Sequence, residues 1–516
     1  MNSSWIIDLL NEIEFSFPVS DWRAAGIRIW PFLRTTLGYK LCFVNENAPE
    51  RTDVQSRFKL AAQQVLALAR GTARYFHAQQ VDRRHNAEPL GKVDAAFLSD
   101  GVSYSNVGGV WYERFCDPLI SCLEKQRLRS FLLCPLHSYF VPRRSPSKFI
   151  QPHLDLLTLK AFAASRFEAE IKQELRGYEE CRQLMVRKGS PVNLPAPSTV
   201  GSQALRIRYL ADFYKHILTR VQPSVGFCVS YYWSGGMAFS LACRELEIPS
   251  VDLQHGVQGE LHFAYGRWCR LPEAGYELLP TVFWCWTQSE ERAIRAWSRR
   301  FEKWHRPFVG GNPWLAQWSD GKHGFAAEYD QGIRSLMEPG RRQILVTLQP
   351  ARTKPLTLQP LLEAVGRSPE EWQWWIRLHP CMEQERDKIR SAFASRTGRE
   401  CRVDGATDVP LCALLRHMDV HVTHSSSAVL EAEAFGVPSV VISTYGAELF
   451  PDQVSSGWAQ VGLQSEEIGE AIHCQLQRHN RYERSRLTIN GFDFKAMLAA
   501  VRGSLSDRYD FARSGA

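Results

Sequence analysis

Residues 420–442 constrain the fold more than any other part of the chain. Two short runs rich in valine and isoleucine, at 420–423 and 437–442, flank a stretch of helix-forming residues. This pattern predicts a strand, a tight turn, a helix and a second strand. Parallel strands in one sheet need a crossover of this kind. The segment therefore predicts an α/β domain.

The turn in this segment consists of His424, Ser425, Ser426 and Ser427. Serine hydroxyls commonly cap helices, and the first N–H groups of a helix also attract anions. Taken alone, the four residues fit a helix cap and a phosphate site equally well. The residues at the ends of the other predicted strands decide between these two interpretations.

Two blocks of alternating strand and helix patterns make up most of the chain. Strands are expected at 93–98, 129–134, 225–229, 250–253 and 281–286 in the first block, and at 344–348, 372–378, 401–403, 420–423 and 437–442 in the second. Residues 110–126, between the first two strands, are expected to be helical, as is a segment that begins at Trp22, and a polar segment is expected at 319–331 after the first block. Alternating blocks of this kind form parallel sheets. The predicted fold class is α/β, with two Rossmann-like domains of the GT-B arrangement facing one another across a cleft and helical additions in the N-terminal half.

The expected domains follow from these blocks and from the breaks around them. We expect a helical N-terminal region at 1–92, a first Rossmann-like domain at 93–312 with a helical insertion at 151–200, a second at 313–480, and a C-terminal segment at 481–516 that packs back on the N-terminal domain. The length of 516 residues suits two or three domains. An amphipathic helix predicted at 53–77 fits either core packing or a membrane surface.

Composition excludes several classes of protein. Thirteen cysteines occur without a CxxC pair, which argues against a zinc site and for reduced thiols. No apolar run reaches membrane-span length and no secretion signal opens the chain, so a cytoplasmic protein is expected. Nucleic acid is not an expected partner, because no nucleic-acid-binding motif occurs. Basic stretches at 51–84 and 295–306 leave open a peripheral contact with the inner face of a membrane.

Polar residues follow the predicted strands of the second block. They are Gln349, Arg352, Arg377, His379, Pro380, His424, Ser425, Ser426 and Ser427, with Glu431 one turn into the next helix. Because the carboxyl ends of parallel strands share one edge, we expect these residues to converge on a nucleotide phosphate, with Glu431 near ribose hydroxyls. A His-Pro turn and a capped helix without a ligand stay open as the alternative.

Strand ends of the first block carry candidate catalytic groups. Asp100, His255 and Glu260 are candidates for the general base, or for a nucleophile in the case of the carboxylates. A buried, hydrogen-bonded core histidine explains His255 equally well. Further strand-end residues, predicted as cleft or linker positions, are Gln254, Gly256, Gly311 and Asn312.

Several short motifs, taken together, resemble known transferases. The pair His379-Pro380, followed by the serine run Ser425–Ser427, resembles the HP and S motifs of bacterial sialyltransferases and capsule-polysaccharide Kdo transferases. The spacing around Glu431 is similar to that in the nucleotide-binding helix of the non-hydrolysing UDP-sugar 2-epimerases. Gln254–Gly256 and Gly311–Pro313 are similar to segments of capsule-type transferases. The double block resembles the GT-B fold.

This resemblance implies a metal-independent glycosyltransferase of bacterial surface-polysaccharide or lipopolysaccharide assembly that needs no cofactor. The implied donor is a CMP-activated sugar, Kdo or a related ulosonic acid, and the implied acceptor is a glycan or lipid-linked glycan on the first domain. Alternatives are a UDP- or GDP-sugar transferase, a CDP-glycerol-type polyol phosphate transferase, a sugar-nucleotide 2-epimerase, or a degenerate nucleotide-binding scaffold. One departure is that the sialyltransferases carry an acidic pair before a glycine, whereas here Ser99 precedes Asp100.

Overall fold

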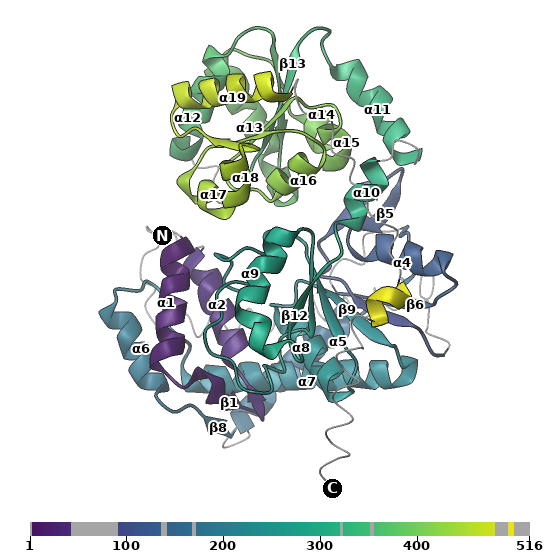
Figure 1. Cartoon of the computed structure of the whole chain (residues 1–516), viewed down its shortest axis with the longest axis vertical. Coiled ribbons are helices and arrows are strands. Elements are labelled where there is room, and N and C mark those ends of the chain that lie inside the picture. The colour runs from purple at the N-terminus through teal and green to yellow at the C-terminus, as the bar shows by residue number, and fades with distance from the viewer. Residues whose placement is uncertain are drawn as a thin grey trace. The chain divides into compact units, whose positions relative to one another are not determined.

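The computed structural model describes residues 3–42, 91–135, 142–167, 172–319, 324–350, 355–479 and 494–499 (Figure 1). The chain divides into two compact units: unit 1 comprises residues 1–105, 109–311 and 491–516, and unit 2 comprises residues 106–108 and 312–490. The helix predicted at 53–77 and the basic stretch at 51–84 lie outside the described residues.

Unit 1 is built on a seven-stranded parallel sheet with the strand order β12-β11-β10-β9-β3-β6-β7. Its strands are β3 (Ala95–Leu98), β6 (Ser130–Cys134), β7 (Ser147–Phe149), β9 (Val225–Val229), β10 (Ser250–Leu253), β11 (Val282–Cys285) and β12 (Arg306–Val309). From β3 the chain adds β6 and β7 on one side. It then returns to place β9 on the other side of β3 and adds β10, β11 and β12 beyond it. The direction reverses between β3 and β9, and ligands in such sheets bind at the carboxyl ends of the strands flanking this point.

Unit 2 repeats this plan with six parallel strands in the order β15-β14-β13-β16-β17-β18. They are β13 (Arg342–Thr347), β14 (Trp372–Arg377), β15 (Cys401–Arg402), β16 (Val420–Thr423), β17 (Ser439–Val441) and β18 (Ala459–Val461). The order reverses between β13 and β16. The prediction of an α/β fold with two Rossmann-like domains is confirmed, whereas the expected cleft stays a prediction.

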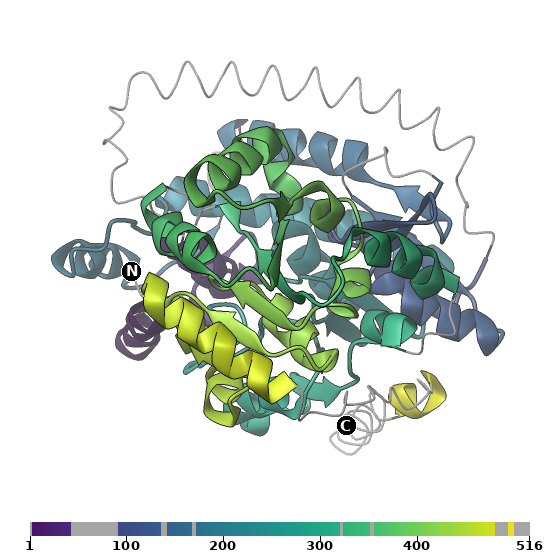
Figure 2. The ribbon, with the colours of Figure 1, turned by 90° about the horizontal axis from the view of Figure 1, so that it is seen from above.

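Helices of unit 2 cover its sheet. They include α12 (Pro355–Arg367), α13 (Arg386–Thr397) and α19 (Ser465–His479), the long yellow helix in Figure 2. Their apolar side chains, such as Leu361, Phe393 and Ile472, form one buried cluster with strand residues such as Val422. Residues 420–442 fold as predicted, with α16 (Ala428–Ala434) between β16 and β17.

Helices of unit 1 include α4 (Cys116–Lys125), α5 (Gln151–Phe167), α6 (Tyr178–Arg187), α7 (Pro197–Val221), α8 (Ser234–Glu245) and α9 (Gln288–Ser298). Within the described part of the chain, no helix is long and apolar enough to cross a membrane. From the C-terminal segment, Phe494 and Met497 pack into the same cluster as Phe97 and Phe227.

Local structure departs from the sequence pattern at three places. Residues 110–126, predicted as helical throughout, begin as strand β5 (Val110–Glu113), since valine and aromatic residues favour extended backbone. A polar connection predicted at 319–331 is largely helix α11 (Gly324–Leu336), which buries Ala326 and Ile333. The segment beginning at Trp22, predicted as helical, is a hairpin whose turn places Ala25 and Gly26 at positive φ.

The N-terminal helices α1 (Ser3–Ser16) and α2 (Trp30–Cys42) belong to the core of unit 1. Glu14 on α1 and Arg34 on α2 form an ion pair whose side chains are both fully buried. The Arg34 guanidinium donates to the carbonyl oxygens of Phe263 and Gly266 at 2.9 and 2.7 Å, and a Glu14 carboxylate oxygen accepts from the N–H of Cys269 at 2.6 Å. The pair thus anchors the connection between β10 and β11.

Candidate functional site

The carboxyl edge of the unit 2 sheet brings Gln349 and Ser425 together, although 76 residues separate them. Oε1 of Gln349, just beyond β13, accepts from the backbone N–H of Ser425 at 2.9 Å and from its hydroxyl at 3.1 Å. The Nδ1 atom of His424 lies 3.2 Å from the same hydroxyl. These predicted residues therefore meet where the strand order reverses, the place at which such sheets bind ligands.

The serine run contributes little to capping the helix that follows it. Ser427 immediately precedes α16 and makes no side-chain cap, while Ser426 Oγ accepts from the N–H of Ala428 at 3.3 Å. Helix α16 has only seven residues, so its dipole is short. Phosphate binding here would rest on hydroxyls and turn N–H groups more than on a helix dipole.

Helix α17 (Thr444–Leu449) also borders this edge, and the sequence pattern did not reveal it. Ser443 caps α17, and its hydroxyl also donates to the carbonyl oxygen of His424 at 2.6 Å. A Cβ atom at Gly446 would lie 2.2 Å from that same carbonyl oxygen. Only a glycine at this position lets α17 approach the serine turn so closely. The helical glycine three residues after a serine is the signal that sequence reasoning could have used.

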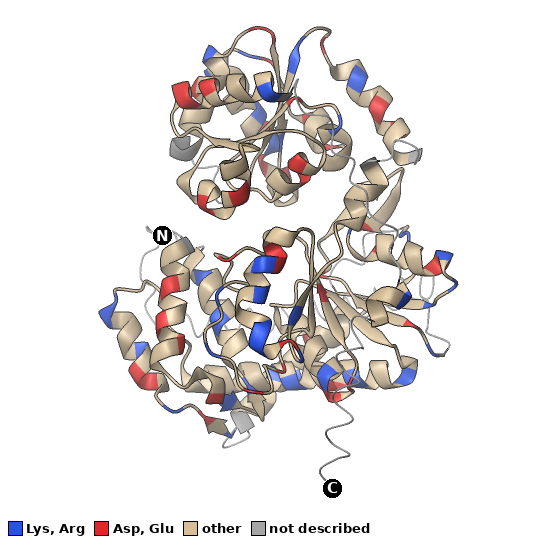
Figure 3. Ribbon diagram, in the orientation of Figure 1, with Lys and Arg blue, Asp and Glu red and all other residues tan. Residues whose placement is uncertain are grey.

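Electrostatics distinguishes this edge from an ordinary phosphate pocket. Residues 417–477 contain eight Asp and Glu residues and no Lys or Arg. Figure 3 shows acidic residues on α16 and α17 and no basic residue there. Glu431, on α16, is 8% exposed. This part of the edge offers hydroxyls, imidazole and a buried carboxylate, which suits sugar hydroxyls and a ligand of low negative charge.

The predicted residues on and after β14 have local structural partners. Arg377 Nη1 donates to the carbonyl oxygens of Ala406 and Val409 at 2.6 and 2.5 Å. Nδ1 of the exposed His379 accepts from the N–H of Cys381 at 3.3 Å and so caps the 3-10 helix η4 (Pro380–Glu385). The phosphate contacts of Arg377 and His379 stay predictions. Arg352 lies outside the described residues.

At the carboxyl edge of unit 1, His255 and Asp100 lie near each other. Burial lowers the pKa of His255. The negative charge of Asp100 opposes this shift, and the positive charge of Arg114 adds to it. His255 Nε2 lies 3.0 Å from the hydroxyl of Tyr232, which follows β9. Asp100 accepts from the N–H groups of Val102 and Ser103, both at 2.9 Å, so its carboxylate is held in a turn. A half-buried imidazole, a phenol and a carboxylate thus share this edge.

Two buried carboxyl groups behind this edge escaped sequence reasoning. Glu113 is fully buried, and burial together with the charge of Asp100 raises its pKa to about 8. One oxygen of Glu113 accepts from the N–H groups of Phe115 and Cys116 at the start of α4. Burial likewise raises the pKa of Asp117 to about 6. Because Glu113 lies in a stretch predicted as helical, its sequence position did not indicate a buried carboxyl group that caps the start of α4.

The remaining predicted residues have structural contacts of their own. Gln254 braces its turn, donating to the carbonyl oxygen of Gly256 at 2.8 Å and accepting from a backbone N–H of the next strand end. Glu260 is exposed and pairs with Arg267 at 3.0 Å. The carbonyl of Gly311 accepts from a tryptophan indole at 2.8 Å, and Asn312 Oδ1 accepts from two N–H groups at the start of α10 (Pro313–Ser319).

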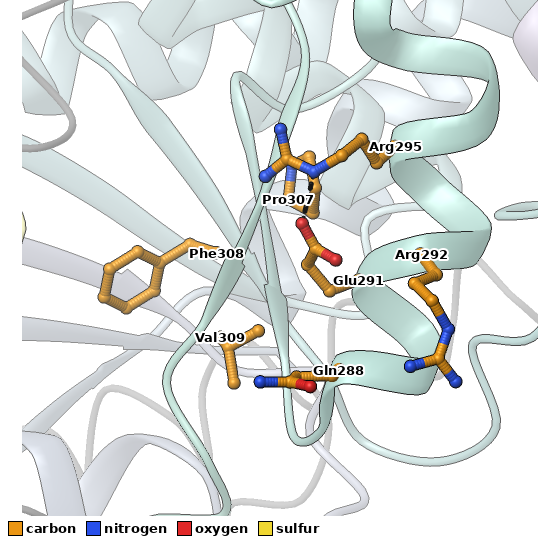
Figure 4. Close-up of a pocket in the computed structure, with 7 residues that line it drawn as sticks. All are labelled: Gln288, Glu291, Arg292, Arg295, Pro307, Phe308 and Val309. Atoms are coloured by element: carbon orange, nitrogen blue, oxygen red, sulfur yellow. Dashed lines mark hydrogen bonds and ion pairs between the residues drawn. The ribbon is translucent and has the colours of Figure 1, made fainter.

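A surface hollow of about 430 Å³ lies between α9 and β12 in unit 1 (Figure 4). It is lined by Gln288, Glu291, Arg292, Arg295, Pro307, Phe308 and Val309, and includes none of the predicted site residues. Glu291 forms an ion pair with Arg295, which also pairs with Glu302. Since these carboxylates neutralise Arg295, the hollow is a poorer anion site than its two arginines suggest.

No protein-family model and no curated protein matches the sequence. Similar solved structures include a putative UDP-N-acetylglucosamine 2-epimerase from Listeria monocytogenes (14% identity, TM-score 0.47, covering 80% of this chain and 97% of that one). Another is the UDP-GlcNAc 2-epimerase from Neisseria meningitidis (14%, 0.44, 80% and 100%), and a third is a spinosyn rhamnosyltransferase (13%, 0.37, 80% and 96%). At these values the likeness has no bearing on the reaction.

Proposed function

We propose that the chain is a nucleotide-sugar-dependent glycosyltransferase that binds its donor at the Gln349–Ser425 edge of unit 2. The observation that carries this proposal is the direct contact of these two residues at the point where the strand order reverses. Glu431, buried one helical turn beyond the serines, is assigned to sugar or ribose hydroxyls. The serine hydroxyls and His379 are assigned to the phosphate.

The lack of Lys and Arg at 417–477 favours a donor with one phosphate. A departing diphosphate carries more negative charge than a departing CMP, and residues 417–477 supply no Lys or Arg to balance it. The preferred donor is therefore a CMP-sugar, with Kdo or a related ulosonic acid as the sugar and a glycan or lipid-linked glycan as the acceptor. The assigned setting is bacterial surface-polysaccharide or lipopolysaccharide assembly.

Transfer breaks the bond between the sugar's anomeric carbon and a phosphate oxygen and forms a bond from that carbon to the acceptor oxygen. The acceptor hydroxyl gives its proton to a general base, while hydrogen-bond donors stabilise the charge on the departing phosphate. Asp100 and His255 of unit 1 are the assigned candidates for the base. Burial lowers the pKa of His255, so its imidazole is neutral and able to take a proton at neutral pH.

A second candidate function is a sugar-nucleotide 2-epimerase, favoured by the buried Glu431 within the helix after the turn. Product analysis separates the two. Incubation with CMP-Kdo and a glycan acceptor releases CMP if the chain is a transferase, whereas incubation with UDP-GlcNAc yields a 2-epimer without nucleotide loss if it is an epimerase. Neither product would appear from a scaffold.

Donor binding is tested by calorimetry with CMP and UDP on the full chain. A His379→Asn variant keeps an N-cap side chain for η4 but lacks the outer ring nitrogen, so it isolates the ligand role from the capping role. We expect His379→Asn and Ser426→Ala each to weaken CMP binding about tenfold or more, the loss of a charge-assisted hydrogen bond. Affinity unchanged in both variants would reject the assignment.

A further inference from the structure

His421 is a fully buried histidine at the centre of the unit 2 sheet. It lies on β16, in register with Leu345 on one side and Ser439 on the other. Its Nε2 lies 2.8 Å from the hydroxyl of Thr347, and its Nδ1 lies 3.0 Å from the hydroxyl of Ser439. The three residues therefore form a hydrogen-bonded row across β13, β16 and β17.

The imidazole in this row is neutral. Burial lowers the pKa of His421 to about 3. A neutral imidazole has one donor and one acceptor nitrogen, so it accepts from one hydroxyl and donates to the other. Thr347 and Ser439 are themselves at most 6% exposed. All three polar side chains are thus satisfied inside the buried sheet, an arrangement that fixes one relative position of the strands.

The row continues toward the serine turn. The hydroxyl of Thr423 donates to the carbonyl oxygen of Thr347 at 3.0 Å, and the N–H of Ser426 donates to the hydroxyl of Thr423 at 3.3 Å. Gln349, two residues after Thr347, accepts from Ser425. Two links therefore join the end of β13 to the serine turn, and His421 contacts Thr347, where one link begins, two residues before Gln349, where the other begins.

An apolar side chain would fill the position of His421 without the cost of burying an imidazole. We propose that His421 is a positioning residue for the nucleotide site: the Ser439–His421–Thr347 row holds the ends of β13 and β16 so that Gln349 and Ser425–Ser427 keep their arrangement. This inference rests on the proposed function for the identity of the ligand. Its effect on the turn itself is independent of any ligand.

Three substitutions at one position separate the two arms of the row. His421→Phe removes both hydrogen bonds. His421→Gln places a polar group near Nε2 and can keep the bond to Thr347, whereas His421→Asn places one near Nδ1 and can keep only the bond to Ser439. Val440→Ala is the matched control, since Val440 is a fully buried neighbour on β17 whose loss destabilises the sheet without touching the row.

Two readouts test the proposal on the full chain. Hydrogen exchange followed by mass spectrometry measures the protection of residues 423–430 without ligand, and calorimetry measures the affinity for CMP and UDP. We expect His421→Phe and His421→Asn to speed exchange selectively at 423–430 and to weaken nucleotide binding roughly 10- to 100-fold, the scale of a small misplacement of binding groups. His421→Gln should restore both properties, and Val440→Ala should change neither selectively.

Wild-type exchange at 423–430 in folded His421→Phe, or a His421→Gln variant no better than His421→Asn, would overturn the proposal. If His421→Phe does not fold, Thr347→Val removes the same hydroxyl bond and is judged by the same two readouts. If wild-type protein binds neither nucleotide, the proposed function fails for these ligands, and the exchange measurement still decides the role of His421.

Discussion

A single oxygen of Gln349 accepts both the backbone N–H and the hydroxyl of Ser425, at 2.9 and 3.1 Å. The contact joins the ends of β13 and β16, the two strands between which the chain reverses its direction of sheet building. One side chain therefore fixes the serine turn at the place where a ligand is expected.

Substitution of Gln349 separates the structural from the electrostatic role of this contact. Gln349→Glu keeps an acceptor oxygen, so we expect the thermal midpoint to stay near wild type, but its charge should repel a phosphate and weaken CMP binding about tenfold or more. Gln349→Leu leaves a Ser425 N–H unpaired and should cost about 1–3 kcal/mol of stability. Calorimetry and thermal denaturation measure both effects. Full CMP affinity in Gln349→Glu would place the phosphate elsewhere.

Gly446 offers a second test of the same edge. A methyl group at this position would lie 2.2 Å from the carbonyl oxygen of His424 and 2.3 Å from Val441, so α17 has to move away. We expect Gly446→Ala to destabilise the protein by about 1–3 kcal/mol, as overpacking does. Gly469 in α19 is the matched control, because nothing lies within 4 Å of its added methyl. Chemical denaturation should show Gly469→Ala unchanged or stabilised, and equal effects at the two sites would contradict the close approach of α17.

The buried pair Glu14–Arg34 predicts a large loss of stability on removal of one partner. Arg34→Met leaves the Glu14 carboxylate buried without its counter-charge and frees two carbonyl oxygens, so we expect a loss of about 3–5 kcal/mol. Adding Glu14→Gln should recover part of that loss, because the uncompensated charge is then gone.

Arg295→Met is the exposed comparison for this pair, since Arg295 is 48% exposed in its ion pair with Glu291. Surface pairs contribute roughly 0–1 kcal/mol, so its unfolding midpoint should scarcely move. A loss of the same size in Arg34→Met and Arg295→Met would show that Glu14 stays solvated.

Part of this architecture was predictable because it depends on local periodicity. Residues 420–442 alternate between runs of β-branched residues and helix formers, and they form the predicted strand, turn, helix and strand. The meeting of Gln349 with Ser425 followed from one topological rule, that carboxyl ends of parallel strands share an edge. At α11 the pattern failed because the chain does not reveal which polar stretch will bury a few apolar residues. At β5 it failed because the preference of valine and aromatic residues for extended backbone prevailed over an apparent helical spacing.

The contacts that the sequence did not reveal are those made by ordinary-looking residues after folding. Thr347, His421 and Ser439 are unremarkable strand residues in a linear reading, and only the register of β13, β16 and β17 brings their side chains into one row. Tyr232 belongs to an aromatic run after β9, and its contact with His255 depends on the neighbouring positions of β9 and β10. The spacing of these residues along the chain does not indicate which side chains become neighbours across adjacent strands.

The raised pKa of the buried Glu113 predicts that the protein loses stability as the pH rises. Its pKa rises from an ordinary 4.5 to about 8, first because of burial and then because of the charge on Asp100. The native state therefore keeps a proton that the unfolded chain releases above pH 4.5. The contribution of this group to stability is complete below that pH and is lost as the pH rises through about 8.

Glu113→Gln should remove this dependence without removing the acceptor, because the amide oxygen can still accept from the N–H groups of Phe115 and Cys116. We expect the thermal midpoint of wild type to fall between about pH 5 and 8 more steeply than that of Glu113→Gln, with the gap between the two curves widest above about pH 8. Asp117 and Asp252, whose pKa values are raised to about 6 and about 7, contribute the slope that remains in the variant. Parallel curves would mean that the native protein buries Glu113 as a carboxylate, stabilised by the N–H groups at the start of α4.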